Sequence, residues 1–493
     1  MNLLRWCHCC IILLVGAYSS AALKIEAGDY KKSTEYVFPS RWVKVISQMA
    51  RDKDLDGANH AFEQMVESKI QPDVFIYTTM INAHATCRDI RGMENWFAKM
   101  EEAGIMANRV TYNTMLKGYA KEGNVIGCQC WYDRMLVAKV RPDVQTFNTL
   151  LNGCAAVGDM ALMEEWYDRM QTVVRADAFT YNTMIKGYSK KGNIKQCQQL
   201  YNQMVAAKVR PDIQTFNTLL DGCAATGDTA LMEEYFEKLV EEGVSPDKVA
   251  YNTVLKGYAK QRNMKQCKQW YSRMLTANVK PDVQTYCTLL DGCAATGNTV
   301  LMEDWFNKMR EVGVWPNKFA YTTMMKGYSK KGNIKQCQHW YGQMVAAKVK
   351  PDVQTFCTLL DGCATAGDTA LMEEYFGKLV EEGLRPDQVA YNTMLKGHAR
   401  KGNIAQCQHW YDQMVRSNIR PNMRTFCTIL DGCVAAGDTA LMEEYFNNMA
   451  DEGVRPDQVA YNIMLKGYAR SGNVTQLHHW RNLMAASNIK PGI

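Results

Sequence analysis

Hydrophobic residues recur along the chain as pairs of short stripes, each with the spacing of one helical face. Within residues 213–247 the first stripe consists of Phe216, Leu219, Leu220 and Cys223, and the second of Met232, Tyr235, Phe236 and Leu239. Side chains at i, i+3, i+4 and i+7 lie on the same side of an α-helix. Gly227 permits a helix to stop between the stripes, and Asp228 is a candidate N-cap for the second helix. The pattern therefore predicts a hairpin of two helices.

The hairpin is repeated along most of the chain. A Pro-Asp or Pro-Asn pair closes most repeats, and from Pro211 onward the interval is always 35 residues. Twelve clear repeats cover residues 74–492, of which residues 144–177 form a repeat one residue short, and a degenerate thirteenth occupies residues 39–73. A lone hairpin cannot bury both stripes, whereas stacked neighbours can. We therefore predict an all-α fold, an α-solenoid superhelix of about 13 tandem helix-turn-helix repeats over residues 39–493.

The repeats alternate between two types whose charges oppose. Residues 213–247 contain one Lys and eight acidic residues, a net charge of −7, whereas residues 318–352 contain seven Lys and one Asp, a net charge of +6. The whole chain of 493 residues has 57 basic and 51 acidic side chains, so its mild net charge of +6 conceals the alternation. We expect adjacent repeats of opposite charge to attract across their stacked faces, although exposed pairs are worth only about 0–1 kcal/mol each.

The first 38 residues differ from the repeats. Residues 1–22 combine a single Arg5, an apolar stretch at residues 11–15 and small residues before Ala22, which is typical of a signal peptide or another targeting segment. A mitochondrial transit peptide would be richer in arginine, and a fortuitous apolar start is the alternative. No apolar run reaches the roughly 20 residues of a membrane span. Residues 23–38 are predicted to be a polar linker.

The cysteines and histidines give no sign of catalysis. Most of the 18 cysteines follow the apolar stripes and are predicted to be small core residues, with disulfides as the alternative in an oxidising compartment. Cys7, Cys9, Cys10 and His8 match no zinc-binding spacing. The eight histidines form no catalytic constellation, and no Gly-rich phosphate loop is present. We therefore predict that the protein is not an enzyme and holds no metal or cofactor.

Two places in each repeat recur with polar side chains. One directly follows the first aromatic residue of the first helix and holds Thr78, Asn113, Asn148, Asn182, Asn217, Asn252, Cys287, Thr322, Cys357, Asn392, Cys427 and Asn462. The other is the last residue of the repeat and holds Asn108, Asp143, Asp177, Asp212, Asp247, Asp282, Asn317, Asp352, Asp387, Asn422 and Asp457. Amides and hydroxyls can hydrogen-bond the edges of nucleic-acid bases. The alternatives are capping or turn chemistry within the hairpin for the first place, and N-capping of the next helix for the second.

A third recurring feature is basic and appears once per 70 residues. A cation lies near the end of the first helix at Lys121, Lys190, Lys260, Lys330, Arg400 and Arg470. A second lies four residues earlier, on the same helical face, at Lys117, Lys186, Lys256, Lys326, Lys396 and Lys466. The residues form either a solvated face or a ladder of cations against a phosphate backbone.

Together these features resemble the pentatricopeptide repeat family over residues 39–492. The resemblance rests on the 35-residue period, the Tyr-Asn-Thr-Met-Leu-Lys-Gly sequence that begins at Tyr391, the Gly-Asn or Gly-Asp turn and the Pro-Asp close. It implies sequence-selective binding of single-stranded RNA, one base per repeat. Tetratricopeptide repeats, with 34 residues and a different aromatic pattern, are the alternative and would imply a peptide-binding scaffold.

The resemblance also implies a role for each recurring residue. The residue after the aromatic and the last residue of the repeat select the base together, and the second residue of the repeat sandwiches it. The apolar sandwiching residues are Phe75, Val110, Phe179, Val249, Phe319, Val389 and Val459, while Gln145, Gln214, Gln284, Gln354 and Arg424 depart from that pattern. Phosphate contacts are assigned to Lys121, Lys190, Lys260, Lys330, Arg400 and Arg470.

Base preferences follow from the resemblance as well. Thr with Asn implies adenine, Asn with Asp uracil, Thr with Asp guanine, and Asn with Asn a pyrimidine. The implied target is 5′-AUUUUUxGxYxx-3′, in which x marks repeats without a standard pair, such as those of Cys287, Cys357 and Cys427. The resemblance further implies a role in RNA processing, stabilisation or translation in a plastid or mitochondrion, without a small-molecule substrate or membrane. The signal-like segment leaves entry by a secretory route or into a secondary plastid open.

Overall fold

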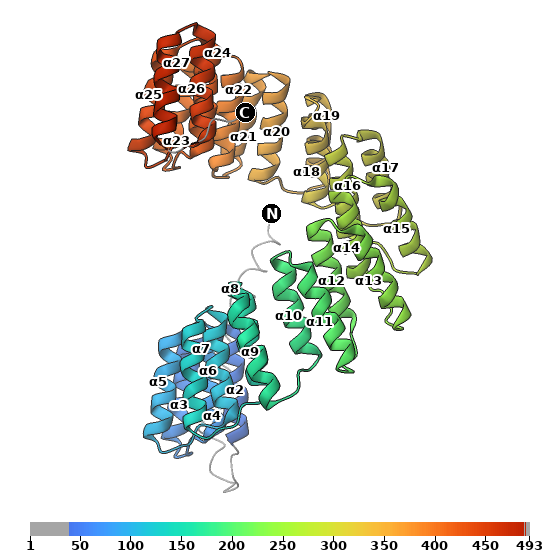
Figure 1. Cartoon of the computed structure of the whole chain (residues 1–493), viewed down its shortest axis with the longest axis vertical. Coiled ribbons are helices and arrows are strands. Elements are labelled where there is room, and N and C mark those ends of the chain that lie inside the picture. Colours follow the sequence, from blue (N-terminus) through green and yellow to red (C-terminus); the bar gives the residue numbers. More distant parts are fainter. Residues whose placement is uncertain (1–38, 488, 490–493) are drawn as a thin grey trace, which may run out of the picture. The chain divides into compact units, whose positions relative to one another are not determined.

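The computed structural model of the chain describes residues 39–487 and residue 489. These residues form 26 α-helices, α2–α27, and no strand, which confirms the predicted all-α fold (Figure 1). Each repeat supplies two helices, so the repeats stack as an α-solenoid of thirteen hairpins. The signal-like segment, the linker and the cluster of Cys7, His8, Cys9 and Cys10 lie outside the described residues.

The first helices of the repeats carry the predicted site residues. They are α2 (Pro39–Asp52), α4 (Val74–Thr86), α6 (Arg109–Lys121), α8 (Val144–Val157), α10 (Ala178–Lys190), α12 (Ile213–Thr226), α14 (Lys248–Lys260), α16 (Val283–Thr296), α18 (Lys318–Ser329), α20 (Val353–Ala366), α22 (Gln388–Arg400), α24 (Met423–Ala436) and α26 (Gln458–Ser471).

The second helices complete the hairpins. They are α3 (Leu55–Glu67), α5 (Ile90–Glu102), α7 (Val125–Val137), α9 (Met160–Val173), α11 (Ile194–Ala206), α13 (Thr229–Glu241), α15 (Met264–Thr276), α17 (Thr299–Glu311), α19 (Ile334–Ala346), α21 (Thr369–Glu381), α23 (Ile404–Arg416), α25 (Thr439–Asp451) and α27 (Val474–Ala486).

The helix ends confirm the predicted stop and cap within a hairpin. Gly227 has a φ of +82°, in the left-handed region that favours glycine, and it closes α12. The Asp228 carboxylate then accepts a hydrogen bond of 3.1 Å from the backbone N–H of Leu231 and caps α13. In the basic repeats an asparagine takes this place, as Asn333 does at the start of α19. A short Gly-Asp or Gly-Asn turn is therefore sufficient to reverse the chain.

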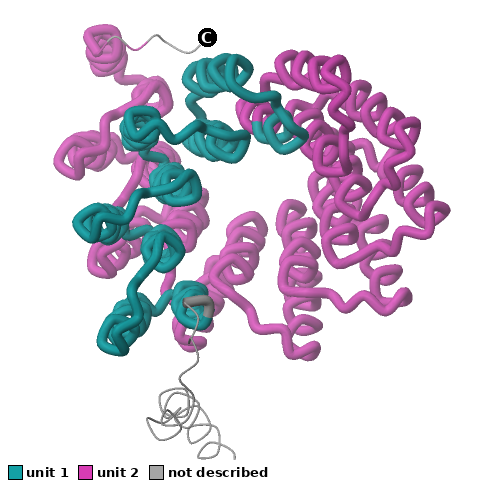
Figure 2. The backbone as a smooth tube through the Cα atoms, turned by 90° about the horizontal axis from the view of Figure 1, so that it is seen from below, with its two compact units in different colours: residues 1–183 teal, residues 184–493 magenta. Residues whose placement is uncertain are grey.

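The chain divides into two compact units, residues 1–183 and residues 184–493, with the division inside α10 (Figure 2). In the N-terminal unit α4 packs on α5 of its own repeat and on α6 of the next. In the C-terminal unit α14 packs in the same way on α15 and α16. Within each unit the first helices therefore stack directly on one another, which places equivalent residues of successive repeats side by side.

Aromatic rings and small side chains fill the space between hairpins. The predicted second stripe, with Tyr235 and Phe236 at its centre, is completely buried. The ring of Phe236 packs edge-on against Trp270 of the next repeat, with centroids 4.7 Å apart. The described cysteines are all free, and those of the stripes, such as Cys197 and Cys223, are buried as predicted.

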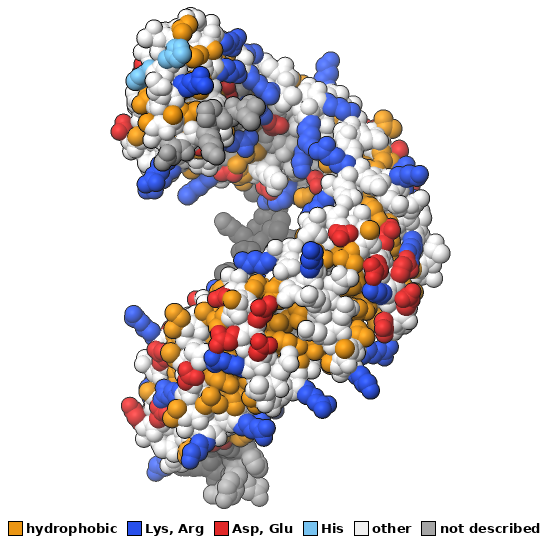
Figure 3. All heavy atoms as spheres, viewed as in Figure 1, with side chains coloured by type: hydrophobic (Ala, Val, Ile, Leu, Met, Phe, Trp, Pro, Cys, Tyr) orange, Lys and Arg blue, Asp and Glu red, His pale blue; other side chains and the backbone are white. Residues whose placement is uncertain are grey.

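Ion pairs join neighbouring repeats of opposite charge. Arg273 Nη1 lies 2.6 Å from Glu237 Oε1, and the same guanidinium stacks over the ring of Trp270. Lys256 Nζ lies 3.1 Å from Asp221 Oδ1, between α14 and α12. Acidic and basic side chains lie close together on the face shown in Figure 3. The pairs are partly exposed, so each stabilises the stack by about 0–1 kcal/mol.

Candidate nucleic-acid interface

The two residues predicted to select a base lie next to each other, and we call them the selector pair of a repeat. Asn113 Nδ2 donates a hydrogen bond to Asp143 Oδ1 at 3.2 Å, and Asn148 Nδ2 donates to Asp177 Oδ1 at 3.2 Å. Equivalent bonds join Asn217 to Asp247 at 3.3 Å, Asn252 to Asp282 at 3.3 Å and Asn392 to Asn422 at 3.5 Å. Residues 29 or 30 positions apart therefore meet, because the first helices of successive repeats are stacked.

The last residue of a repeat also caps the next helix, as the alternative interpretation predicted. Asp143 accepts a hydrogen bond of 2.9 Å from the backbone N–H of Thr146 at the start of α8. Burial on its own raises the pKa of Asp143, but the hydrogen bonds from Thr146 and Asn113 and the nearby charge of Arg109 bring that pKa below its ordinary value. The carboxylate is therefore ionised at neutral pH and acts only as an acceptor.

A threonine completes the group, and it was missed in the sequence. Thr146, the third residue of the next repeat, lies with its Oγ1 2.7 Å from Asn113 Oδ1 and is completely buried. The same bond of 2.7 Å joins Thr180 to Asn148, Thr285 to Asn252, and Thr425 to Asn392. The Asn selectors in these pairs bond to the following repeat, so they do not cap or turn their own hairpin. The available signal was the threonine that recurs two residues before the selector.

Four further selectors each contact one of the two partner residues, either the third residue of the next repeat or the last residue of their own. The hydroxyl of Thr78 lies 2.8 Å from that of Thr111, and the hydroxyl of Thr322 lies 3.2 Å from that of Thr355. Cys287 Sγ lies 3.7 Å from Asn317 Oδ1, and Cys357 Sγ lies 3.8 Å from Asp387 Oδ1, which are weak contacts. Cys427 is half-buried and Asn462 is exposed. The partner predicted for Asn462, Gly492, lies outside the described residues.

The predicted sandwiching residues are exposed. Phe75 is 65% exposed and Phe179 is 54% exposed. Exposure is similar at Val110, Val249, Phe319, Val389 and Val459. The polar residues at this place, Gln145, Gln214, Gln284, Gln354 and Arg424, are exposed as well. A ligand could therefore reach all of them without a rearrangement of the core.

One hollow of the N-terminal unit brings all three kinds of predicted residue together. It has a volume of about 710 Å³ and lies between α6, α8 and the start of α10. Its lining includes the selector pair Asn148 and Asp177, the sandwiching residue Phe179, and the cations Lys117 and Lys121. The pair, the exposed ring and the cations therefore face one space of sufficient size for a base.

Most of the predicted cations of the C-terminal unit already have a partner within the protein. Lys256, Lys326 and Lys396 each lie within 3.1 Å of an aspartate of the preceding first helix, at Asp221, Asp291 and Asp361 respectively. Lys466 lies 3.8 Å from Asp431. Lys330 donates to the carbonyl of Ala294, and Arg400 to that of Ala364, both at 3.2 Å. These aspartates were not predicted from the sequence as partners, although each lies 35 residues before one of these four lysines.

Lys117 and Lys121 lie in a more positive environment. The residue 35 positions before Lys117 is Asn82, not an aspartate. Burial lowers the pKa of Lys121, and the charges of Lys117 and Arg88 lower it further. Repulsion among these cations is relieved when an anion binds, so this hollow is suited to a phosphate group.

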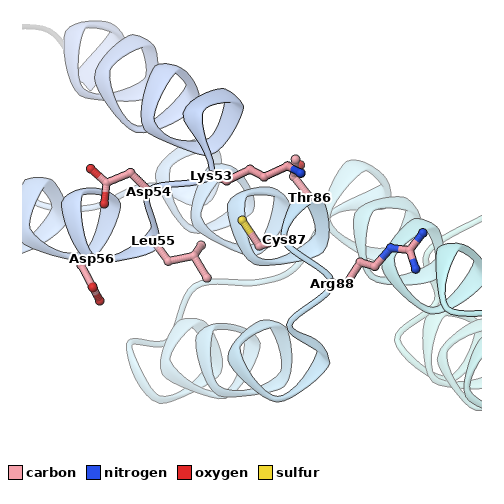
Figure 4. A pocket seen from close by; sticks show the side chains of 7 residues that line it. All are labelled: Lys53, Asp54, Leu55, Asp56, Thr86, Cys87 and Arg88. Atoms are coloured by element: carbon pink, nitrogen blue, oxygen red, sulfur yellow. The ribbon is translucent and has the colours of Figure 1, made fainter. Parts of the chain in front are cut away.

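Three other hollows of the described residues hold none of the predicted site residues. A hollow of about 480 Å³ lies at the turns of the first two hairpins, lined by Lys53, Asp54, Leu55, Asp56, Thr86, Cys87 and Arg88 (Figure 4). It holds no predicted site residue. Between residues 39 and 487 no group of three or more His, Cys, Asp or Glu side chains could hold a metal ion. None of the described helices is long and apolar enough to cross a membrane.

The stacked hairpins define the chain as a helical-repeat protein. Sequence models described as the PPR repeat family match residues 72–121, 107–156, 176–225, 246–295, 316–365 and 386–435. Those of the pentatricopeptide repeat domain match residues 133–191, 271–331, 341–399 and 411–471. The chain therefore belongs to the pentatricopeptide repeat family.

Solved structures agree with this fold. The crystal structure of the pentatricopeptide repeat protein PPR10 from maize is 20% identical, with a TM-score of 0.59, over 92% of this chain and 74% of that chain. The crystal structure of PPR10 in complex with an 18-nt psaJ RNA element is 19% identical, with a TM-score of 0.53, over 93% of this chain and 76% of that chain. No curated protein sequence matches the chain.

Proposed function

We propose that the chain binds single-stranded RNA selectively, with one base for each repeat that carries a hydrogen-bonding selector pair. The hollow around Asn148, Asp177 and Phe179 is the observation that carries the proposal, because it combines polar, aromatic and basic side chains. The bound RNA of the maize relative supports the same class of ligand.

The chemistry of the hollow suits a nucleotide. Each side-chain amide has two hydrogens, and Asn148 uses one of them for Asp177. The other hydrogen and the remaining carboxylate lone pairs are groups that can bond to a base edge. The exposed ring of Phe179 can stack on the base, an interaction worth about 1–3 kcal/mol in single-stranded complexes. Lys117 and Lys121 then contact the phosphate.

Carried along the chain, the selector pairs give the target 5′-AUUUUUxGxYxx-3′, read from the first clear repeat onward. The repeat of Thr78 reads the first base, that of Asn217 the fifth and that of Thr322 the eighth. We place the protein in RNA processing, stabilisation or translation in an organelle. The activity we propose is binding, and no step of catalysis is part of it.

Substitution of one selector tests base selection directly. Asn217→Thr converts an Asn-Asp pair into a Thr-Asp pair, so preference at the fifth base should move from uracil to guanine. Binding is measured for target RNAs that differ only at the fifth base, and a second series that differs only at the third base serves as control, because Asn148 is unchanged. A variant that keeps the preference for uracil at the fifth base would show that the recurring asparagine is structural.

A further inference from the structure

We propose that the third residue of the following repeat determines how strongly a selector discriminates between bases: a threonine there orients the selector, and an alanine leaves it less firmly held and therefore less selective. The proposal rests on the proposed function, since it concerns how the same selector pair reads RNA. It turns the pair into a group of three residues from two adjacent repeats.

The geometry at Asn113 shows why the threonine matters. Because the Asp143 carboxylate can only accept hydrogen bonds, Asn113 must turn its Nδ2 toward it. Asn113 Oδ1 then faces the other way, toward the hydroxyl of Thr146 at 2.7 Å. That hydroxyl also accepts a hydrogen bond of 3.1 Å from the backbone N–H of Asp143, and its own hydrogen is donated to Asn113 Oδ1 at 2.7 Å or to Asp143 Oδ1 at 2.9 Å. Both ends of the amide are thus held in one orientation.

The sequence of selectors and third residues follows this rule along the chain. A threonine stands at the third place of the next repeat after Thr78, Asn113, Asn148, Asn182, Asn252, Thr322 and Asn392. An alanine stands there after Cys287, Cys357 and Cys427, at Ala320, Ala390 and Ala460. Cysteine therefore occurs as the selector only where the donor is missing. A cysteine has no carbonyl oxygen to satisfy, so it avoids the penalty of about 1–3 kcal/mol for a buried polar atom without a partner.

Within the C-terminal unit, Asn217 is an asparagine selector that an alanine follows, whereas Asn252 and Asn392 are followed by threonines that bond to them. The third residue of the next repeat is Ala250, and no described group donates a hydrogen bond to the buried Asn217 Oδ1. Its Nδ2 lies 3.3 and 3.4 Å from the two carboxylate oxygens of Asp247. Only one end of the Asn217 amide is therefore held, whereas both ends of the Asn113 amide are held.

The experiment installs the group of three in a repeat that lacks it. Cys357→Asn creates an Asn-Asp pair with Asp387, and Ala390→Thr supplies the missing donor. The fold accepts a threonine at this place, because Thr111 and Thr180 occupy it in other basic repeats and are completely buried. The full chain and its single and double variants are titrated with target RNAs that carry uracil or adenine at the ninth base.

The double variant should prefer uracil at the ninth base by about fivefold, as expected for one additional oriented hydrogen bond. Ala390→Thr alone should show no preference, and Cys357→Asn alone less than about twofold. In thermal melting, Cys357→Asn should lower the midpoint, and Ala390→Thr should restore it. Equal preference in Cys357→Asn and in the double variant would overturn the proposal.

The natural pairs provide the control that separates this proposal from the function on which it rests. Wild-type chain should prefer uracil at the second base, which Asn113 and Thr146 read. If it does so while the double variant shows no preference at the ninth base, only the role of the threonine is overturned. If wild-type chain prefers no base at any position, the proposed function is overturned together with it. Ala250→Thr should also sharpen the preference for uracil at the fifth base.

Discussion

Lys396 Nζ lies 2.7 Å from Asp361 Oδ1, thirty-five residues earlier in the chain, and the pair bridges two stacked first helices. The same pair recurs as Lys256 with Asp221 and Lys326 with Asp291. A carboxylate so close to a cation competes with any phosphate for it. The charges of these lysines in the C-terminal unit are therefore partly neutralised.

Removal of the aspartate charge beside Lys396 should strengthen RNA binding. Asp361→Asn frees Lys396 for a phosphate, so affinity should rise and its dependence on salt should steepen by up to about 0.7 in log–log slope, the value for one more phosphate contact on a single strand. Glu382→Gln removes the same charge from an exposed site after α21 and should change the slope much less. Equal slopes for the two variants, measured by titration at several salt concentrations, would contradict a role of Lys396 in phosphate contact.

The last residue of each repeat has a capping role that can be separated from base selection. Asp143→Ala removes the N-cap of α8 and should lower the free energy of unfolding by about 1 kcal/mol. Asp143→Asn keeps a capping side chain, as Asn422 does at α24, so stability should change little. This variant should nevertheless widen the preference at the second base from uracil toward cytosine. Thermal melting and RNA titration of both variants check the two effects separately.

Equivalent turns at the ends of second helices differ in backbone strain. Lys348 has a φ of +56°, whereas Gly383, at the same place in the next repeat, has a φ of +72°. A Cβ atom added to Gly383 would meet no other atom within 4 Å, so a side chain there would not clash. A side chain in the left-handed region costs about 1 kcal/mol or more. Gly383→Lys should therefore lower the midpoint of thermal melting, and Lys348→Gly should raise it. Shifts of the same sign in both variants would show that backbone conformation is not the cause.

Buried cysteine thiols should react more slowly than exposed ones. Burial raises the pKa of Cys223 and of Cys363 to about 12, so their reactive thiolates are scarce at pH 8. Cys130 is the exposed cysteine of the described part of the chain and should be alkylated first in the folded protein. Peptide mapping after brief alkylation at pH 8 checks the order. Labelling of Cys223 as fast as that of Cys130 would contradict the buried placement of the stripe.

The fold was predictable because its determinants are local. Phe216 and Leu220 share a face through helical spacing, and Gly227 with Asp228 places the turn, all within one repeat. The adjacency of the selector pair was expected from the family resemblance. The bond from Thr146 to Asn113 was not predicted, because it depends on the offset between two stacked helices. The pairing of Lys256 with Asp221 depends on the same offset, so the alternating charges predicted attraction between repeats but not which side chains meet.

The most direct test of the account compares the full chain with two RNAs of identical composition, one with the sequence 5′-AUUUUUxGxYxx-3′ and one with the same bases scrambled. The undefined positions carry adenine in the target, and both titrations are performed at the same moderate salt concentration. We predict that the target binds at least about tenfold more tightly, a difference of about 1.4 kcal/mol that one or two selected bases would supply. Equal affinity for the two RNAs would contradict base selection by the repeats.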